Sequence, residues 1–165
     1  MKHFLRLKDF SGPQLLELIK SGQHIKKFPS KYFTTLKNKV ILLMFAKPSL
    51  RTRISFEVGM MQLGGHSIYY DLETSTLRKG ESIHDIAKTS SRYIDIIAAR
   101  LYEHEEIDTL AKYADVPVIN ALTNLEHPCQ ILGDFLTILE KKKRLTKTNL
   151  TFLGDCKNNI THSLM

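Results

Sequence analysis

The sequence has no tryptophan, only two cysteines and no long hydrophobic run. Its longest unbroken apolar stretch, Val40 to Ala46, is far shorter than the roughly 20 residues that a membrane-crossing helix needs. Cys129 and Cys156 form no C-x-x-C pair and fit no zinc-ligand spacing. These absences exclude a transmembrane helix and argue against a disulfide, and no bound metal is expected.

Near the amino terminus, charged residues such as Lys2, Arg6 and Lys8 interrupt every apolar stretch before the core of a signal peptide could form. No cleavage site of small residues follows. Two unpaired thiols also suit a reducing compartment. We therefore expect a cytoplasmic location.

Length and composition indicate one folded domain with the start of another. The chain has 165 residues, of which 42% are hydrophobic and 25% charged, as in a globular protein with a real core. We expect the first domain to span residues 1–145, because the basic run at 141–144 is typical of a solvated helix end before a linker. Residues 146–165 would then begin a second, incomplete domain.

Positive charge is concentrated in the first third of the chain. The formal net charge is +7, but residues 1–53 carry 12 Lys or Arg against two acidic residues, whereas residues 54–165 carry 12 against 15. A basic chain often binds nucleic acid, yet this one lacks zinc-finger spacing and the interleaved basic and aromatic residues of single-strand binders. The pattern favours a small anionic ligand and no nucleic acid.

Hydrophobic periodicity predicts a regular alternation of strands and helices. Strands are expected at 40–45, 67–70, 95–101 and 116–121, and helices at 12–21, 51–63, 82–93, 105–114 and 128–141. The strands are apolar on both faces, as in a parallel sheet covered on either side. The predicted fold class is therefore α/β, with three α/β/α layers around a four-stranded parallel sheet. A strand at 150–155 and a helix start at 158–165 would open the second domain.

An anion-binding segment follows the first predicted strand. Ser49, Arg51 and Thr52 stand in Lys-Pro-Ser-Leu-Arg-Thr-Arg, where the next helix begins. Backbone amides at a helix N-terminus attract anions, and a guanidinium can add a bidentate pair. The glycines of a nucleotide P-loop are missing. Ser49 alone would more simply cap the helix, with the arginines on its surface, but the whole cluster favours a phosphate site.

Two further strand ends carry polar groups. Arg100 follows the third strand, and His127 and Gln130 follow the fourth, around a proline suited to a first helical position. Carboxyl ends of parallel strands meet at one edge of the sheet, so these groups are expected to face the anion site. A single histidine here could instead cap or pack the helix. Together the groups suit polarising a carbonyl beside a phosphate, as in carbamoyl or acyl phosphate chemistry.

Two motifs carry a family resemblance. Residues 45–57 read Phe-Ala-Lys-Pro-Ser-Leu-Arg-Thr-Arg-Ile-Ser-Phe-Glu, and residues 127–130 read His-Pro-Cys-Gln. In this order they resemble the aspartate and ornithine carbamoyltransferase family, specifically its amino-terminal domain. The resemblance covers nearly the whole chain and implies a carbamoyl-phosphate-binding domain at 1–145, the first elements of an amino-acid-binding domain at 146–165, and no cofactor.

The resemblance implies that Ser49, Arg51 and Thr52, with the amide of Leu50, hold the phosphate. Many ornithine-type enzymes have threonine where Leu50 stands, so one hydroxyl is missing here while the backbone donor remains.

The resemblance also assigns catalytic roles. Arg100 and His127, with Thr52, would bind the carbamoyl oxygen as it gains negative charge in the tetrahedral transition state. Gln130 would orient the carbamoyl amino group.

Ser75, Thr76 and Lys79 resemble the loop that, in this family, reaches into the neighbouring subunit's site, which implies a homotrimer. The ornithine type often has glutamine where Thr76 stands, whereas Lys79-Gly80-Glu81 is similar to the aspartate type.

The acceptor amine is implied by residues 154–159, Gly-Asp-Cys-Lys-Asn-Asn, which resemble the ornithine type. There the second asparagine contacts the amino acid, so Asn159 is the candidate ornithine ligand. The implied reaction transfers the carbamoyl group from carbamoyl phosphate to the δ-amine of ornithine, giving citrulline in arginine metabolism. Aspartate, putrescine or an acylated ornithine are alternative acceptors.

Two segments of the family's second domain, Asp-x-x-x-Ser-Met and a later Cys-Leu-Pro, do not occur. We therefore expect a truncated or fragmentary transferase that makes no citrulline by itself. A function of another class also stays open, namely a non-catalytic anion-binding or assembly module that uses residues 49–53 and 72–81.

Overall fold

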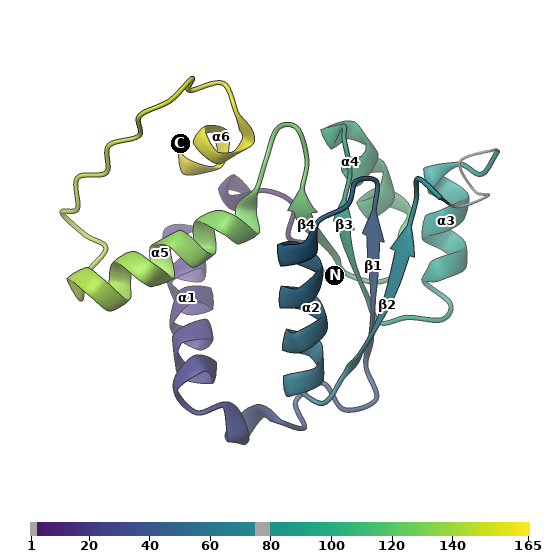
Figure 1. Cartoon of the computed structure of the whole chain (residues 1–165), viewed down its shortest axis with the longest axis horizontal. Helices are drawn as coiled ribbons and strands as arrows, with labels where there is room; N and C mark the ends of the chain where they lie inside the picture. Colours follow the sequence, from purple (N-terminus) through teal and green to yellow (C-terminus); the bar gives the residue numbers. More distant parts are fainter. Residues whose placement is uncertain (1–2, 75–79) are drawn as a thin grey trace.

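The computed structural model describes residues 3–74 and 80–165. Four parallel strands form one sheet in the order β2-β1-β3-β4 (Figure 1), with β1 at Val40–Phe45, β2 at His66–Asp71, β3 at Ile96–Arg100 and β4 at Val118–Leu122. The predicted α/β class and its four-stranded parallel sheet are confirmed. Each strand lies within one or two residues of its expected ends.

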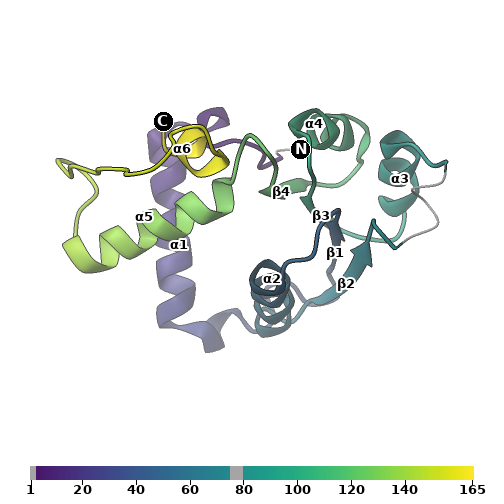
Figure 2. The same ribbon diagram turned by 45° about the horizontal axis from the view of Figure 1, so that its top comes forward.

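Helices flank both faces of this sheet. They are α1 Gly12–Lys27, α2 Leu50–Gln62, α3 Ile83–Ser90, α4 His104–Tyr113, α5 Pro128–Lys142 and α6 Asn159–Leu164, with short 3-10 turns at Leu7–Asp9 and Pro29–Tyr32. α3 and α4 lie on one face, and α2 lies on the other beside the pair formed by α1 and α5 (Figures 1 and 2). The three predicted layers are therefore present.

The first helix continues beyond the expected 12–21 as far as Lys27. Ser11 and Gln14 form a capping box at its start, and basic residues occupy its last turn, where they interact favourably with the helix dipole. Residues 22–27, beyond the expected end, are thus helical as well.

β1 is the centre of the core, and its residues alternate between the two helical layers. Met44 packs in a cluster with Ile107 of α4, whereas Leu43 and Phe45 pack in a second cluster with Met60 of α2. The three β1 side chains are fully buried. Because both faces are covered, a continuous apolar strand is stable here, and it gives the segment that follows Phe45 a rigid base.

Gly64 ends the turn that joins α2 to β2. Its φ is +84°, in the left-handed region, and a Cβ placed there would lie 2.2 Å from the Phe33 carbonyl oxygen. Glycine is required at this position for both reasons.

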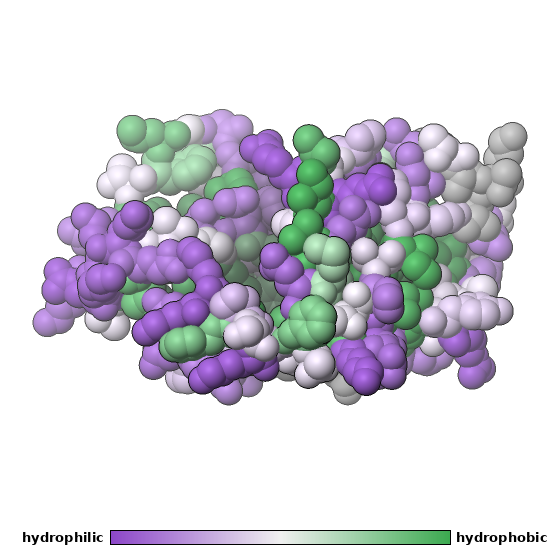
Figure 3. All heavy atoms as spheres, turned by 60° about the horizontal axis from the view of Figure 1, so that its bottom comes forward, coloured by the Kyte–Doolittle hydropathy of each residue, from purple (hydrophilic) through white to green (hydrophobic). Residues whose placement is uncertain are grey.

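The outer face of α2 is apolar and exposed. Leu50, Ile54, Val58 and Met61 recur every three or four residues, and between 38% and 72% of each is accessible to solvent. Figure 3 shows a narrow hydrophobic strip bordered by hydrophilic side chains on one face of the molecule. No described element covers this strip.

The strand expected at 150–155 does not form, and that prediction is wrong. Residues 148–153 have no regular structure, and Leu153 is 91% exposed. A strand needs hydrogen bonds from a neighbour, and the open side of β4 is already bridged by Phe4, which pairs with Ile119. The helix start expected at 158–165 is confirmed as α6.

The predicted inter-subunit residues Ser75, Thr76 and Lys79 lie outside the described residues. In the part of the chain that is described, no helix is both long enough and apolar enough to cross a membrane.

Candidate active site

The first turn of α2 lacks a side-chain cap. Ser49 precedes the helix with an extended backbone, φ −157° and ψ 103°, but its side chain accepts no hydrogen bond from the first-turn amides. Its hydroxyl donates instead to Thr52 Oγ1 at 2.9 Å. The amides at this N-terminus are therefore left for another acceptor, an arrangement that suits an anion. The simple capping alternative for Ser49 is not what the structure contains.

Arg100 reaches this turn from the end of β3. Its Nη1 donates to Thr52 Oγ1 at 3.4 Å, and its Nε is buried without a hydrogen-bond partner among the described residues. Burial lowers the pKa of Arg100, and repulsion from Arg51 lowers it further. Neither arginine forms an ion pair with an acidic residue in the described ranges. A bound anion would relieve the repulsion and satisfy the buried donor.

Arg53 points away from this cluster. Its Nε donates to Glu57 Oε1 at 2.9 Å, and its guanidinium lies 3.9 Å from the ring centre of Tyr69. Arg51 is therefore the guanidinium of this motif that is left available to a ligand, and Arg53 is a matched control for mutagenesis.

His127 joins the site from the start of α5, where Pro128 takes the first helical position. Its backbone N–H donates to Ser163 Oγ at 2.8 Å, and its Nδ1 is buried without a partner in the described chain. Burial lowers the pKa of His127 to about 4, and repulsion from Arg100 acts in the same direction, against a weaker opposite effect of Asp134. The imidazole is thus neutral at pH 7 and can donate one hydrogen bond to an oxygen that gains charge.

The other predicted site residues lie less directly at this centre. Gln130 is exposed, and its Nε2 donates to Asp134 Oδ1 at 2.9 Å, one turn along α5. Asn159 Nδ2 donates to the Thr123 carbonyl at 2.8 Å, which places it beside the loop that precedes His127. Leu50 contributes an exposed side chain and a first-turn amide.

The sequence did not indicate the buried polar side chains that pack next to His127. Glu126 and Ser163 are 7% and 6% exposed, and the Ser163 hydroxyl donates to Glu126 Oε2 at 2.5 Å. His104, 3% exposed, pairs through Nδ1 with Thr123 Oγ1 at 2.8 Å. The adjacency of Glu126 to His127 was a signal, but nothing in the pattern indicated a partner 37 positions away.

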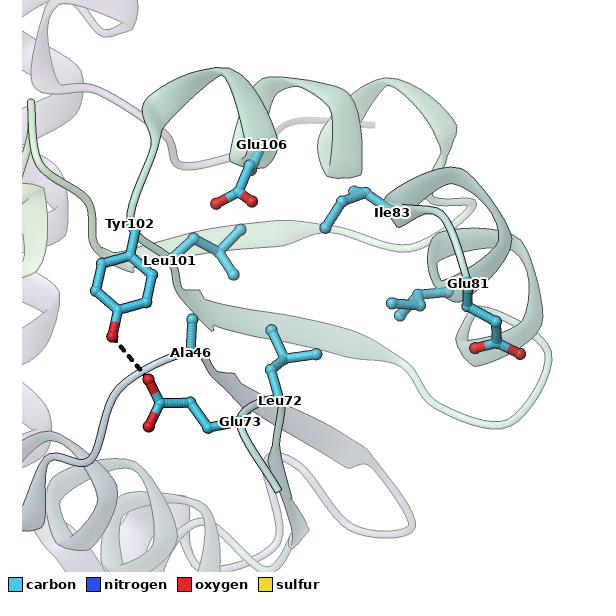
Figure 4. Close-up of a pocket in the computed structure, with 9 residues that line it drawn as sticks. Ala46, Leu72, Glu73, Glu81, Ile83, Leu101, Tyr102 and Glu106 are labelled. Carbon is cyan, nitrogen blue, oxygen red and sulfur yellow. Dashed lines mark hydrogen bonds between the residues drawn. The ribbon is translucent and has the colours of Figure 1, made fainter. Parts of the chain in front are cut away.

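A separate cavity of about 220 Å³ lies between α3, α4 and the ends of β1 and β3 (Figure 4). Glu73, Glu81 and Glu106 line it together with aliphatic side chains, and the Tyr102 hydroxyl donates to Glu73 Oε1 at 2.8 Å. It includes none of the predicted phosphate-binding residues, and its carboxylates would repel a phosphate. Within residues 3–74 and 80–165, no cluster of three His, Cys, Asp or Glu side chains could hold a metal ion.

The fold and these three strand ends define an α/β domain with cationic and hydrogen-bonding side chains gathered at one edge of its sheet. Residues 2–140 match the family described as aspartate/ornithine carbamoyltransferase, carbamoyl-P binding domain. The chain therefore belongs to the aspartate/ornithine carbamoyltransferase family, as the two motifs predicted.

Curated relatives agree with this membership. The ornithine carbamoyltransferase of Shewanella oneidensis is 46% identical over 165 residues, which is 100% of this chain and 54% of that protein. The ornithine carbamoyltransferase of Thermococcus kodakarensis is 46% identical over 163 residues, 98% of this chain and 51% of that protein. The chain spans about half the length of the curated relatives it matches.

Solved structures give the same result. The ornithine carbamoyltransferase of Pyrococcus furiosus matches with a TM-score of 0.93 and 41% identity, over 99% of this chain and 52% of that one. The catalytic subunit of M. jannaschii aspartate transcarbamoylase matches with a TM-score of 0.91 and 33% identity, over 99% of this chain and 55% of that one.

Proposed function

We propose that this chain binds carbamoyl phosphate and supplies the carbamoyl-phosphate-binding half of an ornithine carbamoyltransferase. One observation carries the proposal: at the uncapped start of α2, the Thr52 hydroxyl oxygen accepts hydrogen bonds from both Ser49 and Arg100. A phosphate at that helix start and a carbonyl oxygen beside Arg100 would together occupy the donors that the chain leaves unpaired.

In the proposed reaction, the first-turn amides of α2, Ser49 and Arg51 hold the phosphate group. Arg100, Thr52 and neutral His127 donate hydrogen bonds to the carbamoyl oxygen, which gains negative charge as the amine attacks the carbonyl carbon. The bond between that carbon and the phosphate oxygen then breaks, phosphate leaves with the electron pair, and the departing phosphate takes up the proton that the attacking nitrogen loses. The protein contributes position and electrostatics, with Gln130 proposed to turn toward the carbamoyl amino group.

The proposed acceptor is the δ-amine of ornithine, with Asn159 as its ligand. The curated relatives cited above are named ornithine carbamoyltransferases, and the ornithine-type structure shares 41% identity against 33% for the aspartate-type one. Aspartate remains the acceptor to compare against.

The remaining parts of the proposal concern organisation. Residues 1–145 would form the carbamoyl-phosphate domain, and residues 146–165 would belong to the amino-acid domain. The chain would act in the cytoplasm, in arginine biosynthesis, as a homotrimer whose neighbouring subunit lends the 75–79 loop. The exposed apolar strip of α2 supports assembly, since burying it would remove apolar surface from water.

Calorimetric titration of carbamoyl phosphate into the 165-residue chain tests the binding step, with inorganic phosphate as the comparison ligand. We expect saturable binding tighter than that of phosphate, lost in Arg51→Ala and kept within about twofold in Arg53→Ala, since Arg53 is already paired with Glu57. Equal losses in both variants, or no preference over phosphate, would contradict the assignment.

The acceptor is tested by fusing this chain to the carboxyl-terminal half of the Shewanella oneidensis relative. The fusion should form citrulline from ornithine, and Asn159→Ala should raise the KM for ornithine more than it lowers kcat. A non-catalytic binding module would bind carbamoyl phosphate but give an inactive fusion.

A further inference from the structure

Helix α6 holds the loop that leads into His127 by three hydrogen bonds from one face. Asn159 Nδ2 donates to the Thr123 carbonyl at 2.8 Å, and His162 Nδ1 lies 3.0 Å from the Leu125 carbonyl oxygen. Ser163 Oγ accepts the His127 backbone N–H at 2.8 Å. Residues 159, 162 and 163 are three and four positions apart, so they lie side by side on the helix.

Ser163 is bound on both sides. Besides accepting from His127, its hydroxyl donates to Glu126 Oε2 at 2.5 Å. Both Ser163 and Glu126 are buried, where a hydrogen bond to a carboxyl group is strong and an unmade one is costly. The hydroxyl therefore has one available orientation, and it fixes the His127 amide relative to the preceding residue.

The loop is rigid on its own side as well. Thr123 N–H donates to the Glu126 carbonyl at 2.9 Å, and Glu126 N–H donates back to Thr123 Oγ1 at 3.1 Å. These hydrogen bonds close the turn between Thr123 and Glu126 but do not include His127. The hydrogen bond from the His127 amide to the Ser163 hydroxyl fixes the next residue of the loop. The His127 imidazole has no hydrogen bond at Nδ1 among the described residues, so its placement depends on its backbone and on packing.

We propose that Ser163, oriented by Glu126, is a positioning residue that aims the His127 imidazole at the carbamoyl oxygen. The inference rests on the proposed function, in which that oxygen is the acceptor of the His127 hydrogen bond. Phosphate groups are held by α2 and do not need His127. Loss of the Ser163 hydroxyl should therefore weaken the binding of carbamoyl phosphate and spare the binding of inorganic phosphate.

The test compares both ligands by calorimetry in the full chain. Ser163→Ala is expected to weaken carbamoyl phosphate binding by about three- to tenfold, because the variant loses one hydrogen bond that orients His127. Phosphate binding should stay within about twofold. Ser163→Thr keeps the hydroxyl and should restore the preference for carbamoyl phosphate. His162→Ala is the matched control, because it removes one α6 contact to the same loop without touching His127.

Hydrogen exchange of the His127 amide gives a second readout that needs no ligand. It should become about tenfold faster in Ser163→Ala and remain slow in Ser163→Thr and His162→Ala. Equal weakening of both ligands, or the same change in His162→Ala, would overturn the positioning role and leave α6 as a general support.

Wild-type binding separates this inference from the proposal on which it rests. If the wild-type chain does not prefer carbamoyl phosphate over phosphate, the proposed function is contradicted and the inference with it. If the preference exists but is unchanged in Ser163→Ala, only the inference is overturned.

Discussion

Arg100 Nη1 lies 3.4 Å from Thr52 Oγ1, across 48 positions of sequence, and joins the end of β3 to the first turn of α2. The same threonine oxygen accepts from Ser49 at 2.9 Å, so one hydroxyl connects two strand ends. In the absence of ligand, this arrangement keeps a partly buried guanidinium without an acidic partner among the described residues. A buried cation without an acidic partner lowers the free energy of unfolding of the ligand-free protein, and it is available to bind an anion.

Arg100→Met should therefore preserve the stability of the ligand-free protein and remove its stabilisation by carbamoyl phosphate. We expect the free energy of unfolding of the ligand-free variant to be unchanged or higher by up to about 2 kcal/mol, because a desolvated cation is replaced by an apolar side chain of similar length. Carbamoyl phosphate should no longer stabilise the variant, whereas it should stabilise the wild type in proportion to its occupancy. Urea unfolding with and without the ligand measures both quantities.

Arg53→Met is the control for this comparison. Arg53 is paired on the surface with Glu57, so its loss should change stability by less than about 0.5 kcal/mol and preserve the ligand effect. A destabilised Arg100→Met protein would contradict the view that Arg100 is held at a cost for ligand binding.

The lowered pKa of His127 should make the stability of the protein depend on pH. Its pKa is about 4 in the folded chain and 6.5 ordinarily, so between these values the unfolded chain binds a proton that the folded chain does not. The free energy of unfolding should therefore fall as the pH drops from about 6.5 to about 4, by less than about 1.4 kcal/mol per pH unit because the two states differ by less than one bound proton.

His127→Gln isolates this effect. His3 and His104 also have lowered pKa values through burial, and they remain in both proteins, so the difference between wild type and variant reports His127. The wild type should lose stability more steeply than the variant on acidification. Parallel curves from pH 7 to pH 4.5 would mean that His127 titrates normally, and its proposed neutral donor role would then be limited to higher pH.

The shared location of Ser49, Arg51, Arg100 and His127 could be predicted from sequence because each stands at the end of a buried apolar strand or in the loop and helix start that follow it. Parallel strands bring those ends to one edge, so strand assignment alone brings residues about 75 positions apart into one site. Strand assignment was reliable for the same reason that the core is stable: β1 is apolar throughout and buried on both faces.

Other features depended on partners that a local pattern does not reveal. Leu150, Phe152 and Leu153 favoured the predicted strand at 150–155, but a strand forms only where a neighbour supplies hydrogen bonds, and Phe4 already pairs with the open side of β4. The hydrogen bond from Ser163 to Glu126 joins two polar residues, and the sequence around each of them predicts an exposed position. Gln130 lies in the first turn of the helix expected at 128–141, yet its amide pairs with Asp134 along α5.

The apolar strip on α2 makes a prediction about assembly. If copies of the chain associate through it, as the proposed homotrimer supposes, Met61→Glu should lower the sedimentation coefficient at a given concentration, because a charge would be buried in the interface. Gln62→Glu, next to it and also exposed, is the matched control and should sediment as the wild type does. A wild-type chain that sediments as a monomer at every concentration would contradict this use of the strip.

Two glycines of the α2 region should respond in opposite ways to alanine. Gly64 has φ +84°, and an added Cβ would lie 2.2 Å from the Phe33 carbonyl oxygen, so Gly64→Ala should lower the free energy of unfolding by about 2 kcal/mol or more through backbone strain and steric displacement. Gly59 lies within α2 with open space around its Cα, so Gly59→Ala should raise stability by about 0.5–1 kcal/mol.

Urea unfolding of both variants at neutral pH checks the pair of glycine predictions. Because Ser49, Arg51 and Thr52 lie at the other end of α2, the phosphate affinity of Gly59→Ala should match the wild type. The turn at Gly64, by contrast, sets how α2 packs against β1 and β2. A Gly64→Ala protein as stable as the wild type would show that this turn can relax, and that the direction of α2 is maintained by its packing on the sheet instead.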